Sequence, residues 1–483
     1  MKAPVITIVA VAAFGLATAQ SAELDRNAIP DHIKALQDEN KEARLRAARE
    51  LGNFGSAAKA AVDPLRSVML EDKDPEVRAQ AVRSLGRIGA AAVPLLEQAL
   101  GRTDDVVRYQ VLGALSKIGP DARDAAPAIM EVLKDKTART RARAAFVLGE
   151  IGPHPRLVAP ALVEALRDTN RSVAVNAANT LIRLGPACVP FLAVGLKEKD
   201  SRTRYWCAYA LGMIGMEAKE AVRDLTEALR DRERSVHLVA AAALGAIGPA
   251  AEPAVPELLE DLKDKRPEVQ TEAALALAAI GRPAVSFLAE VVQEGNNAVR
   301  PKALLVLGMI GPDAREALAA LTRALGDKDA NIKALACLAL GQIGRKAAPA
   351  IPRLTLLLDE QEPNVRVAAA LALARIQPED QGAQARLERE IDRVPYSKGS
   401  AGRLAQLDAQ RQAAIDRFID FFVYTTSFEF GVALSRRAKL EVTRLGPEAI
   451  PAMVRGLNKL QANPVGKVKV AEKGAGPRTF YFI

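Results

Sequence analysis

Apolar residues recur at helical spacing in a stretch of the chain that ends at a glycine. Residues 74–89 read DPEVRAQAVRSLGRIG, and their apolar positions are spaced by four, four and three residues: Val77, Ala81, Leu85 and Ile88. This spacing places them on one stripe of a helix, and glycine commonly ends such a helix. The pattern therefore predicts a helix with one buried face that stops at Gly89.

The same ending returns along most of the chain. Its closing glycine, replaced by Gln377 in the last copy, recurs at intervals of 30, 33 or 34 residues: Gly55, Gly89, Gly119, Gly152, Gly185, Gly215, Gly248, Gly281, Gly311 and Gly344. Self-similarity with this period is typical of stacked repeat proteins. We call the helix that ends at this residue the glycine-ended helix of its repeat, and we count positions backward from the closing residue.

Two positions of the glycine-ended helix indicate why the register is kept. Eight residues before the closing residue, nine of eleven copies have alanine, and Val111 and Cys207 complete the set. Small side chains there let neighbouring helices approach closely. Eleven residues before it, most copies carry a cation: Arg44, Arg78, Arg108, Arg141, Arg204, Arg300, Lys333 and Arg366. Acidic residues commonly precede these cations, which predicts a ladder of inter-repeat ion pairs; an anion-binding row is the alternative.

A second helix follows each closing glycine, and proline usually opens it: Pro94, Pro127, Pro160, Pro190, Pro256 and Pro352. Proline fits the first helical turn because its missing N–H is not needed there. We call this helix the proline-opened helix. After Gly89, Gly185 and Gly281, which lie 96 residues apart, the interval is only 30 residues. Three residues are thus lost in every third turn, which indicates growth by triplication of a three-repeat block.

Two helices per unit, with the pattern VRxxAAxxLGxIG on the glycine-ended helix, resemble HEAT-like repeats of the phycobilisome-lyase type over roughly residues 30–377. Ankyrin and tetratricopeptide repeats have similar periods, but their signatures are missing. The resemblance implies an all-α fold, a right-handed α-solenoid of about 11–12 two-helix repeats, with eleven repeats over residues 23–377.

Residues 1–22 have the features of an export signal. Lys2 gives the positive start, an apolar run covers residues 5–16, and Ala-Thr-Ala at residues 17–19 offers a cleavage site, with Ala22 as a second option. The run is too short for a membrane span. A buried amphipathic first helix is the alternative. No later stretch reaches the roughly 20 apolar residues of a spanning helix, so we expect no membrane span and an exported protein, periplasmic or secreted.

Composition limits the core and the partners. Hydrophobic residues make up 49% of the chain but aromatic ones only 4%, so Ala, Leu, Val and Ile build the core. We interpret the three cysteines, Cys188, Cys207 and Cys337, as core residues because they lie at helical positions. The net charge is +9, of which residues 382–483 carry +7, with 17 Lys+Arg against 10 Asp+Glu. The repeats are nearly neutral, and we expect no nucleic-acid partner.

The period lapses after Gln377 and then recovers. We predict an aromatic-rich helical insertion over residues 378–433, a twelfth, partial repeat over residues 434–461, and a basic, Gly-rich tail over residues 462–483. Seven of the 12 phenylalanines follow residue 417, including Phe418 and Phe422. They either cap the open core of the last repeat or form a binding surface, because insertions into solenoids lie on one side of the stack.

Signals for catalysis are thin. The chain has only three histidines, His32, His154 and His237, and none is followed by Glu. The iron-binding His-Glu pairs of the HEAT-like deoxyhypusine hydroxylases are therefore missing. No zinc-ligand spacing, P-loop, dinucleotide-binding fingerprint or nucleophile elbow is present. We expect no catalytic residues, no metal site and no cofactor.

Residues 9, 6 and 2 positions before the closing residue lie off the buried stripe, and in HEAT solenoids this ridge generally lines the concave face. It begins basic, with Arg46, Arg49, Arg83 and Arg87, then becomes aromatic, and then apolar. An apolar, Met-bearing groove would suit a peptide; tight packing that buries these residues is the alternative. Our candidate partner-binding residues are Tyr109, Tyr205, Trp206, Tyr209, Met213, Leu305, Met309, Phe418 and Phe422.

Two hypotheses follow. The favoured one is a noncatalytic, exported scaffold that binds a protein or peptide along the concave face, with Tyr205, Trp206 and Tyr209 as the central hot spot. The alternative is a subunit similar to the phycobilisome lyases that holds a chromophore or another small ligand. Docking of the Phe418 segment into the groove of its own chain is a third possibility, and the oligomeric state stays open.

Overall fold

The computed structural model describes residues 26–101, 104–294, 298–393, 468–472 and 475–480. The chain forms two compact units, Met1–Ile280 and Gly281–Ile483. The predicted export signal and the residues Phe418 and Phe422 lie outside the described residues.

The glycine-ended helices form where the apolar stripe predicts them. In the first unit they are α3 (Lys41–Asn53), α5 (Pro75–Ile88), α7 (Asp105–Ile118), α9 (Ala138–Ile151), α11 (Arg171–Leu184), α13 (Ser201–Ile214), α15 (Arg234–Ile247) and α17 (Pro267–Ile280). In the second unit they are α19 (Arg300–Ile310), α21 (Ala330–Ile343) and α23 (Pro363–Ile376). All but α3 end at the residue before the closing position. Several begin at an Asp or Asn side chain that accepts a backbone N–H, such as Asp74 from Glu76.

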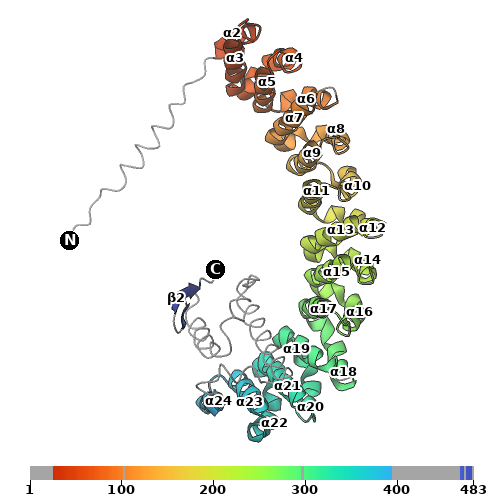
Figure 1. The fold of residues 1–483 in the computed structure, drawn as a ribbon, viewed down its shortest axis with the longest axis vertical. Coiled ribbons are helices and arrows are strands. Elements are labelled where there is room, and N and C mark those ends of the chain that lie inside the picture. The colour runs from red at the N-terminus through yellow and green to blue at the C-terminus, as the bar shows by residue number, and fades with distance from the viewer. Residues whose placement is uncertain (1–25, 102–103, 295–297, 394–467, 473–474, 481–483) are drawn as a thin grey trace, which may run out of the picture. The chain divides into compact units, whose positions relative to one another are not determined.

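The proline-opened helices alternate with them. In the first unit they are α2 (Ile29–Ala35), α4 (Val62–Glu71), α6 (Val93–Leu100), α8 (Ala126–Val132), α10 (Pro155–Ala165), α12 (Val189–Gly195), α14 (Val222–Ala228) and α16 (Val255–Asp261). In the second they are α18 (Val285–Glu294), α20 (Leu318–Ala324) and α22 (Ile351–Leu356), and α24 (Gln381–Arg393) follows. Within the first unit the two kinds of helix form two parallel rows (Figure 1). The predicted all-α repeat fold is confirmed.

The role predicted for one proline is wrong. Pro160 lies inside α10 and does not open it. The helix begins five residues earlier at Pro155, because Pro155 fits the first turn and the His154 ring nitrogen accepts the N–H of Arg156. The sequence offers two prolines here, and the earlier one has the capping partner.

Short 3₁₀ turns join the closing glycine to the next helix, and they explain the lost residues. Seven-residue turns follow most closing glycines: η2 (Gly55–Ala61), η4 (Gly119–Ala125), η6 (Gly215–Ala221), η7 (Gly248–Ala254), η9 (Gly311–Ala317) and η10 (Gly344–Ala350). The short intervals instead contain η3 (Ala90–Ala92), η5 (Gly185–Cys188) and η8 (Arg282–Ala284). The remaining turns are η1 (Arg26–Ala28) and η11 (Leu357–Asp359). Glycine is required at the closing position because, for example, Gly89 has φ 90° and ψ −145°, a conformation that other residues avoid.

Small residues let successive glycine-ended helices approach closely. The residue eight positions before the closing residue is at most 2% exposed in every repeat, as predicted. A second small position, three residues before it, was not anticipated. A Cβ added to Gly86 would lie 2.9 Å from the Cβ of Ala114 on α7, and one added to Gly52 would lie 2.6 Å from the Ser84 hydroxyl on α5. The glycine in the LGxIG pattern is therefore a contact point between neighbouring helices.

The three cysteines lie in the core, as predicted. Cys188, Cys207 and Cys337 are fully buried and free. Burial raises the pKa of the Cys188 thiol to about 11 and that of Cys337 to about 12. Cys207 takes the place of the usual alanine eight positions before Gly215, and the larger side chain fits because Gly195 faces it: a Cβ on Gly195 would lie 2.4 Å from the Cys207 sulfur.

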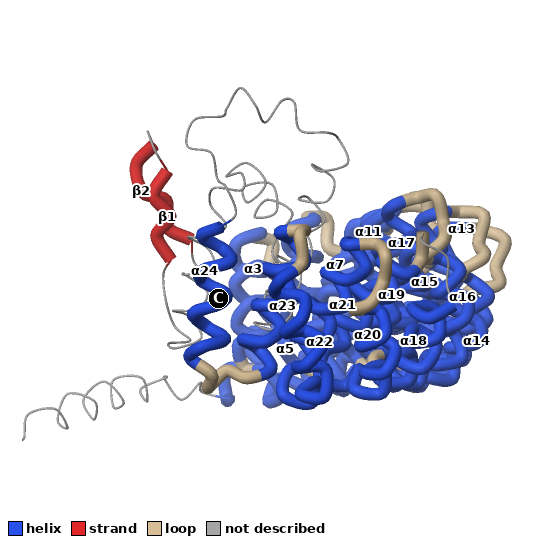
Figure 2. The backbone as a smooth tube through the Cα atoms, turned by 90° about the horizontal axis from the view of Figure 1, so that it is seen from below, coloured by secondary structure: helices blue, strands red, loops and turns tan. Residues whose placement is uncertain are grey.

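Beyond Gln377 the helical stack continues through α24, which packs on α23. Further along, Val468–Glu472 (β1) and Ala475–Phe480 (β2) form an antiparallel pair in the predicted basic tail, with Val468 opposite Phe480. Among the described residues, Figure 2 shows helices throughout the repeats and strands at β1 and β2. The insertion over residues 378–433 lies outside the described residues from 394 on, as does the twelfth repeat over residues 434–461. The proposed division of the chain stays a prediction.

Two segments of the described chain, Arg171–Gly195 and Arg234–Asp261, are long and apolar enough to cross a membrane by length and composition alone. Gly185 and Gly248, both with positive φ, divide them into α11 and α12 and into α15 and α16. These helices pack against neighbouring repeats of the first unit, as α11 does against α9 and α13. The expected absence of a membrane span stays a prediction.

Candidate functional site

The cations eleven positions before the closing residue form the predicted ladder of inter-repeat ion pairs. The cation–carboxylate pairs are Arg44–Asp72 at 2.7 Å, Arg141–Asp168 at 2.6 Å, Arg204–Asp231 at 2.5 Å, Arg300–Asp327 at 2.5 Å, Lys333–Glu360 at 2.5 Å, Arg366–Glu390 at 3.0 Å, and Arg108–Asp135. His237 takes the same position and lies 2.8 Å from Asp261. We call this set the ion-pair ladder. The acids that precede the cations are the partners, as predicted, and each of them pairs with the cation of the previous repeat: Asp72, which precedes Arg78, pairs with Arg44.

Each complete rung joins two repeats through several hydrogen bonds. Arg141 donates to both carboxylate oxygens of Asp168, at 2.6 and 2.9 Å, and also to the carbonyl oxygens of Asp135 and Lys136, at 2.9 and 3.1 Å. The hydrogen bonds from Arg141 lower the pKa of Asp168 below its ordinary value. The ladder cations are thus neutralised within the fold, which disfavours the alternative of an anion-binding row.

The ladder is interrupted at the ends of the three-repeat blocks. Ala174 and Gln270 stand in place of the cation before the short turns at Gly185 and Gly281. Arg78, before the short turn at Gly89, donates to the carbonyl of Asp72 in its own repeat. The short turns therefore follow those repeats in which the ladder cation is replaced or donates within its own repeat.

The ridge residues of the first unit lie side by side on successive helices. Two positions before the closing glycine, Arg87 of α5 donates to the Asn53 side chain of α3 at 2.7 Å. In the same register, Arg183 of α11 forms an ion pair with Glu150 of α9. We define the unit-1 ridge as the residues 9, 6 and 2 positions before the closing glycine on α3 to α15.

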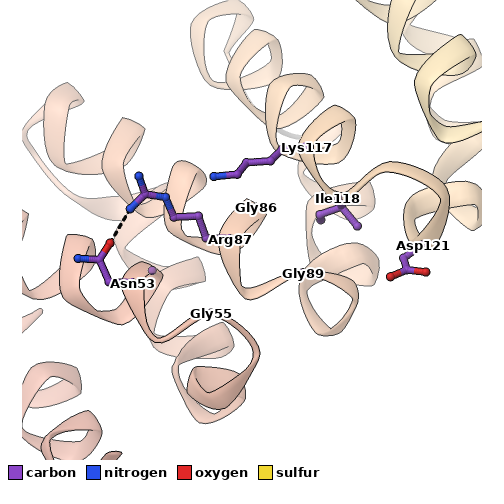
Figure 3. A pocket seen from close by; sticks show the side chains of 9 residues that line it. Asn53, Gly55, Gly86, Arg87, Gly89, Lys117, Ile118 and Asp121 are labelled. Atoms are coloured by element: carbon purple, nitrogen blue, oxygen red, sulfur yellow. Dashed lines mark hydrogen bonds between the residues drawn. The ribbon is translucent and has the colours of Figure 1, made fainter. Parts of the chain in front are cut away.

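An open hollow of about 540 Å³ lies where the ridge crosses the ends of α3, α5 and α7. Asn53, Arg87 and Lys117 contribute from one side of it, together with the closely packed glycines Gly52 and Gly86. Figure 3 shows the Lys117 side chain extending toward the Arg87 guanidinium, while Asp121 lies on the far side. Four glycines line the hollow, and the cations Arg87 and Lys117 lie beside them.

Further along, guanidinium groups and aromatic rings alternate. The Arg139 guanidinium lies 4.3 Å from the centre of the Tyr109 ring, and Arg143 lies 5.7 Å from Tyr109 and 5.6 Å from Phe146. Arg183 approaches Phe146 from α11 at 6.0 Å. Phe146 is 36% exposed. These cation–π contacts hold the rings and charges at the surface as one cluster.

Two buried polar side-chain atoms on the unit-1 ridge have no hydrogen-bond partner, and they are the only such atoms in the described chain. They are Oε1 of Gln110 on α7 and Nε of Arg143 on α9, both nine positions before their closing glycines. One is an acceptor and the other a donor. Buried polar groups are rarely left unpaired, so this pair favours a ligand that offers both an N–H and a C=O.

The predicted hot spot forms one cluster on α13. Trp206 packs edge-on against Tyr205 and Tyr209, with ring centres 5.3 and 5.5 Å apart. All three rings are half-buried, and Met213 beyond them is 58% exposed. The three rings therefore hold one another in place and remain partly accessible to solvent.

The described candidates of the second unit are half-buried, like the rings on α13. Leu305 and Met309 on α19 are half-buried, as is Leu335 on α21, and Leu338 is only 6% exposed. Burial by packing, the alternative to an open apolar groove, applies to Leu338 among these residues. Phe418 and Phe422 lie outside the described residues, so their predicted role is untested.

Four residues of the cluster of guanidinium groups and rings are not among the predicted site residues: Arg139, Arg143, Phe146 and Arg183. Phe146 and Arg143 stand six and nine positions before Gly152, so the register could have identified both. Arg139 and the pairing of Arg183 with the Phe146 ring needed the structure, because those contacts cross between helices. Within the residues that the structure describes, no three His, Cys, Asp or Glu side chains group closely enough to hold a metal ion.

A family model for HEAT repeats matches the chain at residues 29–116, 93–160, 159–245, 222–308, 251–338, 285–374 and 324–393. A search of curated proteins finds no match. Among solved structures, an engineered protein is 24% identical, with a TM-score of 0.33, over 72% of this chain and 98% of its own. Kap95p, whose binding acts on the switch loops of RanGDP, is 13% identical, with a TM-score of 0.43, over 92% of this chain and 67% of its own.

Kap121p bound to Ste12p is a third similar structure. It is 14% identical, with a TM-score of 0.45, over 90% of this chain. The chain spans about half of Kap121p, 52% of its length.

Proposed function

The chain belongs to the HEAT repeat family, and we propose that it is an exported, noncatalytic scaffold that binds a protein or peptide along the ridge of its glycine-ended helices. One observation carries the proposal: the unit-1 ridge keeps arginine, aromatic and methionine side chains half-buried or exposed on successive helices. These residue types are enriched at the centres of protein interfaces. The chain's other arginine row, the ion-pair ladder, is by contrast neutralised inside the fold.

Two further features support a polypeptide ligand. Stacked repeats present an extended surface, which suits a long, narrow partner better than a compact small molecule. The unpaired acceptor on Gln110 and donor on Arg143 match the N–H and C=O that every peptide unit carries. Trp206 and Met213 then offer an apolar anchor point two helices further along.

The test compares partner capture by matched variants. We expect a Trp206→Ala, Tyr209→Ala variant to lose a partner that the parent protein captures from cell-envelope extract. The control, Leu157→Ala with Val194→Ala, removes exposed apolar side chains from the proline-opened helices α10 and α12 and should leave capture unchanged. Mass spectrometry identifies the captured proteins, and circular dichroism confirms equal helicity.

Equal capture by the Trp206 variant and the parent would remove α13 from the binding site. Loss of capture in the control variant as well would show that the partner binds any exposed apolar side chain. The proposal that the ridge is the binding site would then fail.

Export is a separate part of the proposal and rests on residues 1–22. The full chain, produced in a bacterial host with two membranes, should be recovered from the periplasm with Gln20 or Glu23 as its first residue. N-terminal sequencing decides, and an intact Met1 in the cytoplasmic fraction would contradict export.

We also propose that the repeats are of the phycobilisome-lyase type, because VRxxAAxxLGxIG recurs on the glycine-ended helices. The alternative function, holding a chromophore, follows from that resemblance. Titration of a bilin with the protein tests it: an absorbance shift that the Trp206→Ala, Tyr209→Ala variant lacks would favour the small-ligand function over the scaffold.

A further inference from the structure

The first three glycine-ended helices carry a row of cations that the fold does not neutralise. Arg46, Arg49, Arg83, Arg87 and Lys117 are all exposed, and no described carboxylate forms an ion pair with any of them. They occupy five of the nine ridge positions on α3, α5 and α7, and none of the nine is acidic. We call these five residues the basic segment of the ridge.

The basic segment is organised by the helices beneath it. Arg83 donates to the Gln80 side chain at 2.8 Å, and Arg87 donates to the Asn53 side chain at 2.7 Å, so both guanidinium groups are held by neutral partners. The Asn53 amide in turn donates to the Glu50 carboxylate at 3.2 Å, but no ion pair joins Glu50 to either arginine. Lys117 projects into the same hollow as Arg87 (Figure 3). A row of positioned, unpaired cations is electrostatically complementary to a row of anions.

We propose that the basic segment binds an acidic peptide segment in an extended conformation, which crosses α3, α5 and α7 in turn. This inference rests on the proposed scaffold function and makes it more specific, because it assigns the chemistry of the partner. The partner continues over the Arg143 and Phe146 cluster toward Trp206, where apolar residues take over from acidic ones.

The repeat spacing determines the pattern of acids. Packed helices lie about 8–10 Å apart. An extended or polyproline chain advances about 3.1–3.4 Å per residue, so every third residue advances about one helix. In a polyproline helix these third residues also share one face. A peptide with Asp or Glu at every third position therefore presents one carboxylate to each glycine-ended helix.

A peptide fits this surface better than a nucleic acid. On each helix the ridge runs from nine to two positions before the closing glycine. It is therefore about 10 Å long, because each of these seven steps rises 1.5 Å. Carboxylates flank this strip, with Glu42 and Glu76 one turn before it and Asp121 beyond it.

The experiment measures binding of defined peptides to the full chain by fluorescence polarisation at about 0.15 M salt, where screening acts over about 8 Å. The probe is a labelled peptide of six Glu-Pro-Pro units. Comparison probes are six Lys-Pro-Pro units, a peptide with the same composition but all six Glu residues consecutive, and a single-stranded oligothymidine with six phosphates. We expect the Glu-Pro-Pro peptide to bind most tightly.

The matched variants separate position from net charge. Arg49→Glu with Arg83→Glu reverses two cations of the basic segment, and Lys59→Glu with Lys73→Glu reverses two exposed cations outside the ridge. Both variants change the net charge equally. We expect the first to weaken binding of the Glu-Pro-Pro peptide about tenfold and the second by less than about twofold.

Equal weakening by both variants would overturn the proposal, as would equal binding of the Lys-Pro-Pro peptide. Tighter binding of the oligothymidine, lost in the Arg49→Glu, Arg83→Glu variant, would reassign the segment to nucleic acid. If the natural partner is lost with Trp206→Ala, Tyr209→Ala but retained with Arg49→Glu, Arg83→Glu, the acidic-peptide inference fails while the scaffold function stands.

Discussion

Two arginines on α9, only two residues apart, have opposite roles. Arg141, eleven positions before the closing glycine, is held by Asp168 of the next repeat and by two backbone carbonyls. Arg143, nine positions before it, lies over the rings of Tyr109 and Phe146 and keeps an unpaired Nε. A shift of two residues turns the side chain by about 200° around the helix, from the joint between repeats to the ridge. Register, and not residue type, decides whether a cation stabilises the stack or is available to a partner.

The same comparison applies to apolar residues of α9 and gives the largest expected effect. Leu148 is fully buried, while Phe146 on the ridge is 36% exposed. We expect Leu148→Ala to lower the free energy of unfolding by about 3 kcal/mol and Phe146→Ala by about 1 kcal/mol or less. Denaturant unfolding followed by circular dichroism measures both. A larger loss for Phe146→Ala would mean that the ridge is a structural surface.

Replacing the two arginines tests the comparison directly. Arg141→Met leaves the Asp168 carboxylate and two carbonyls without their donor, so we expect a loss of about 2 kcal/mol. Arg143→Met removes cation–π contacts only and should cost about 0.5–1 kcal/mol. Hydrogen exchange of α9 and α10 locates the effect. Similar costs for the two variants would contradict the division between ladder and ridge.

The ladder should also make stability depend on acid. The pKa of Asp168 in the folded protein lies below its ordinary, unfolded value, because Arg141 donates hydrogen bonds to the carboxylate. Its contribution is therefore fully present above that unfolded value and is lost as the pH falls through the folded pKa. We expect Asp168→Asn to cost about 1–2 kcal/mol at pH 7 and to unfold with a shallower acid dependence. The same decrease of the free energy of unfolding with falling pH in the parent protein and in Asp168→Asn would contradict this role.

The smallest expected effect comes from a substitution within the ion-pair ladder. Lys333 is the one lysine among its described rungs and reaches Glu360 through a single donor at 2.5 Å. Lys333→Arg should raise the free energy of unfolding by about 0.5 kcal/mol, because a guanidinium can bind both carboxylate oxygens of Glu360. It can also donate to backbone carbonyls of its own repeat, as Arg366 does in the last repeat. The melting temperature measures the gain; a decrease would show that the Lys333 pocket cannot hold the longer side chain.

Much of the fold could be predicted because each repeat has the same local sequence pattern. The stripe of Val77, Leu85 and Ile88 and the glycine at Gly89 define a helix and its end without reference to any distant residue. Eleven copies of that pattern make chance agreement negligible. The role of Pro160 could not be predicted, because two prolines competed and the His154 cap decided between them.

The placement of the candidate residues could be predicted only in part, and their role in binding stays a prediction. Tyr205, Trp206 and Tyr209 follow from the register, and their mutual packing agrees with it. The Arg143 and Phe146 cluster was missed because its order comes from rings and guanidinium groups on different helices. Sequence spacing gives the face of a helix on which a residue lies, but not which side chain of the next helix meets it.

The sequence by itself determined the repeat period, the helix ends and the registers of core, ladder and ridge, since these depend on local periodicity. Only the tertiary structure decided that Arg141 pairs with Asp168 of the next repeat and that Gly86 marks a close approach to Ala114. It also decided that Arg49 and Arg83 keep their charge exposed. The physical reason is that pairing and exposure depend on how successive helices stack, and stacking geometry is a property of neighbouring repeats together.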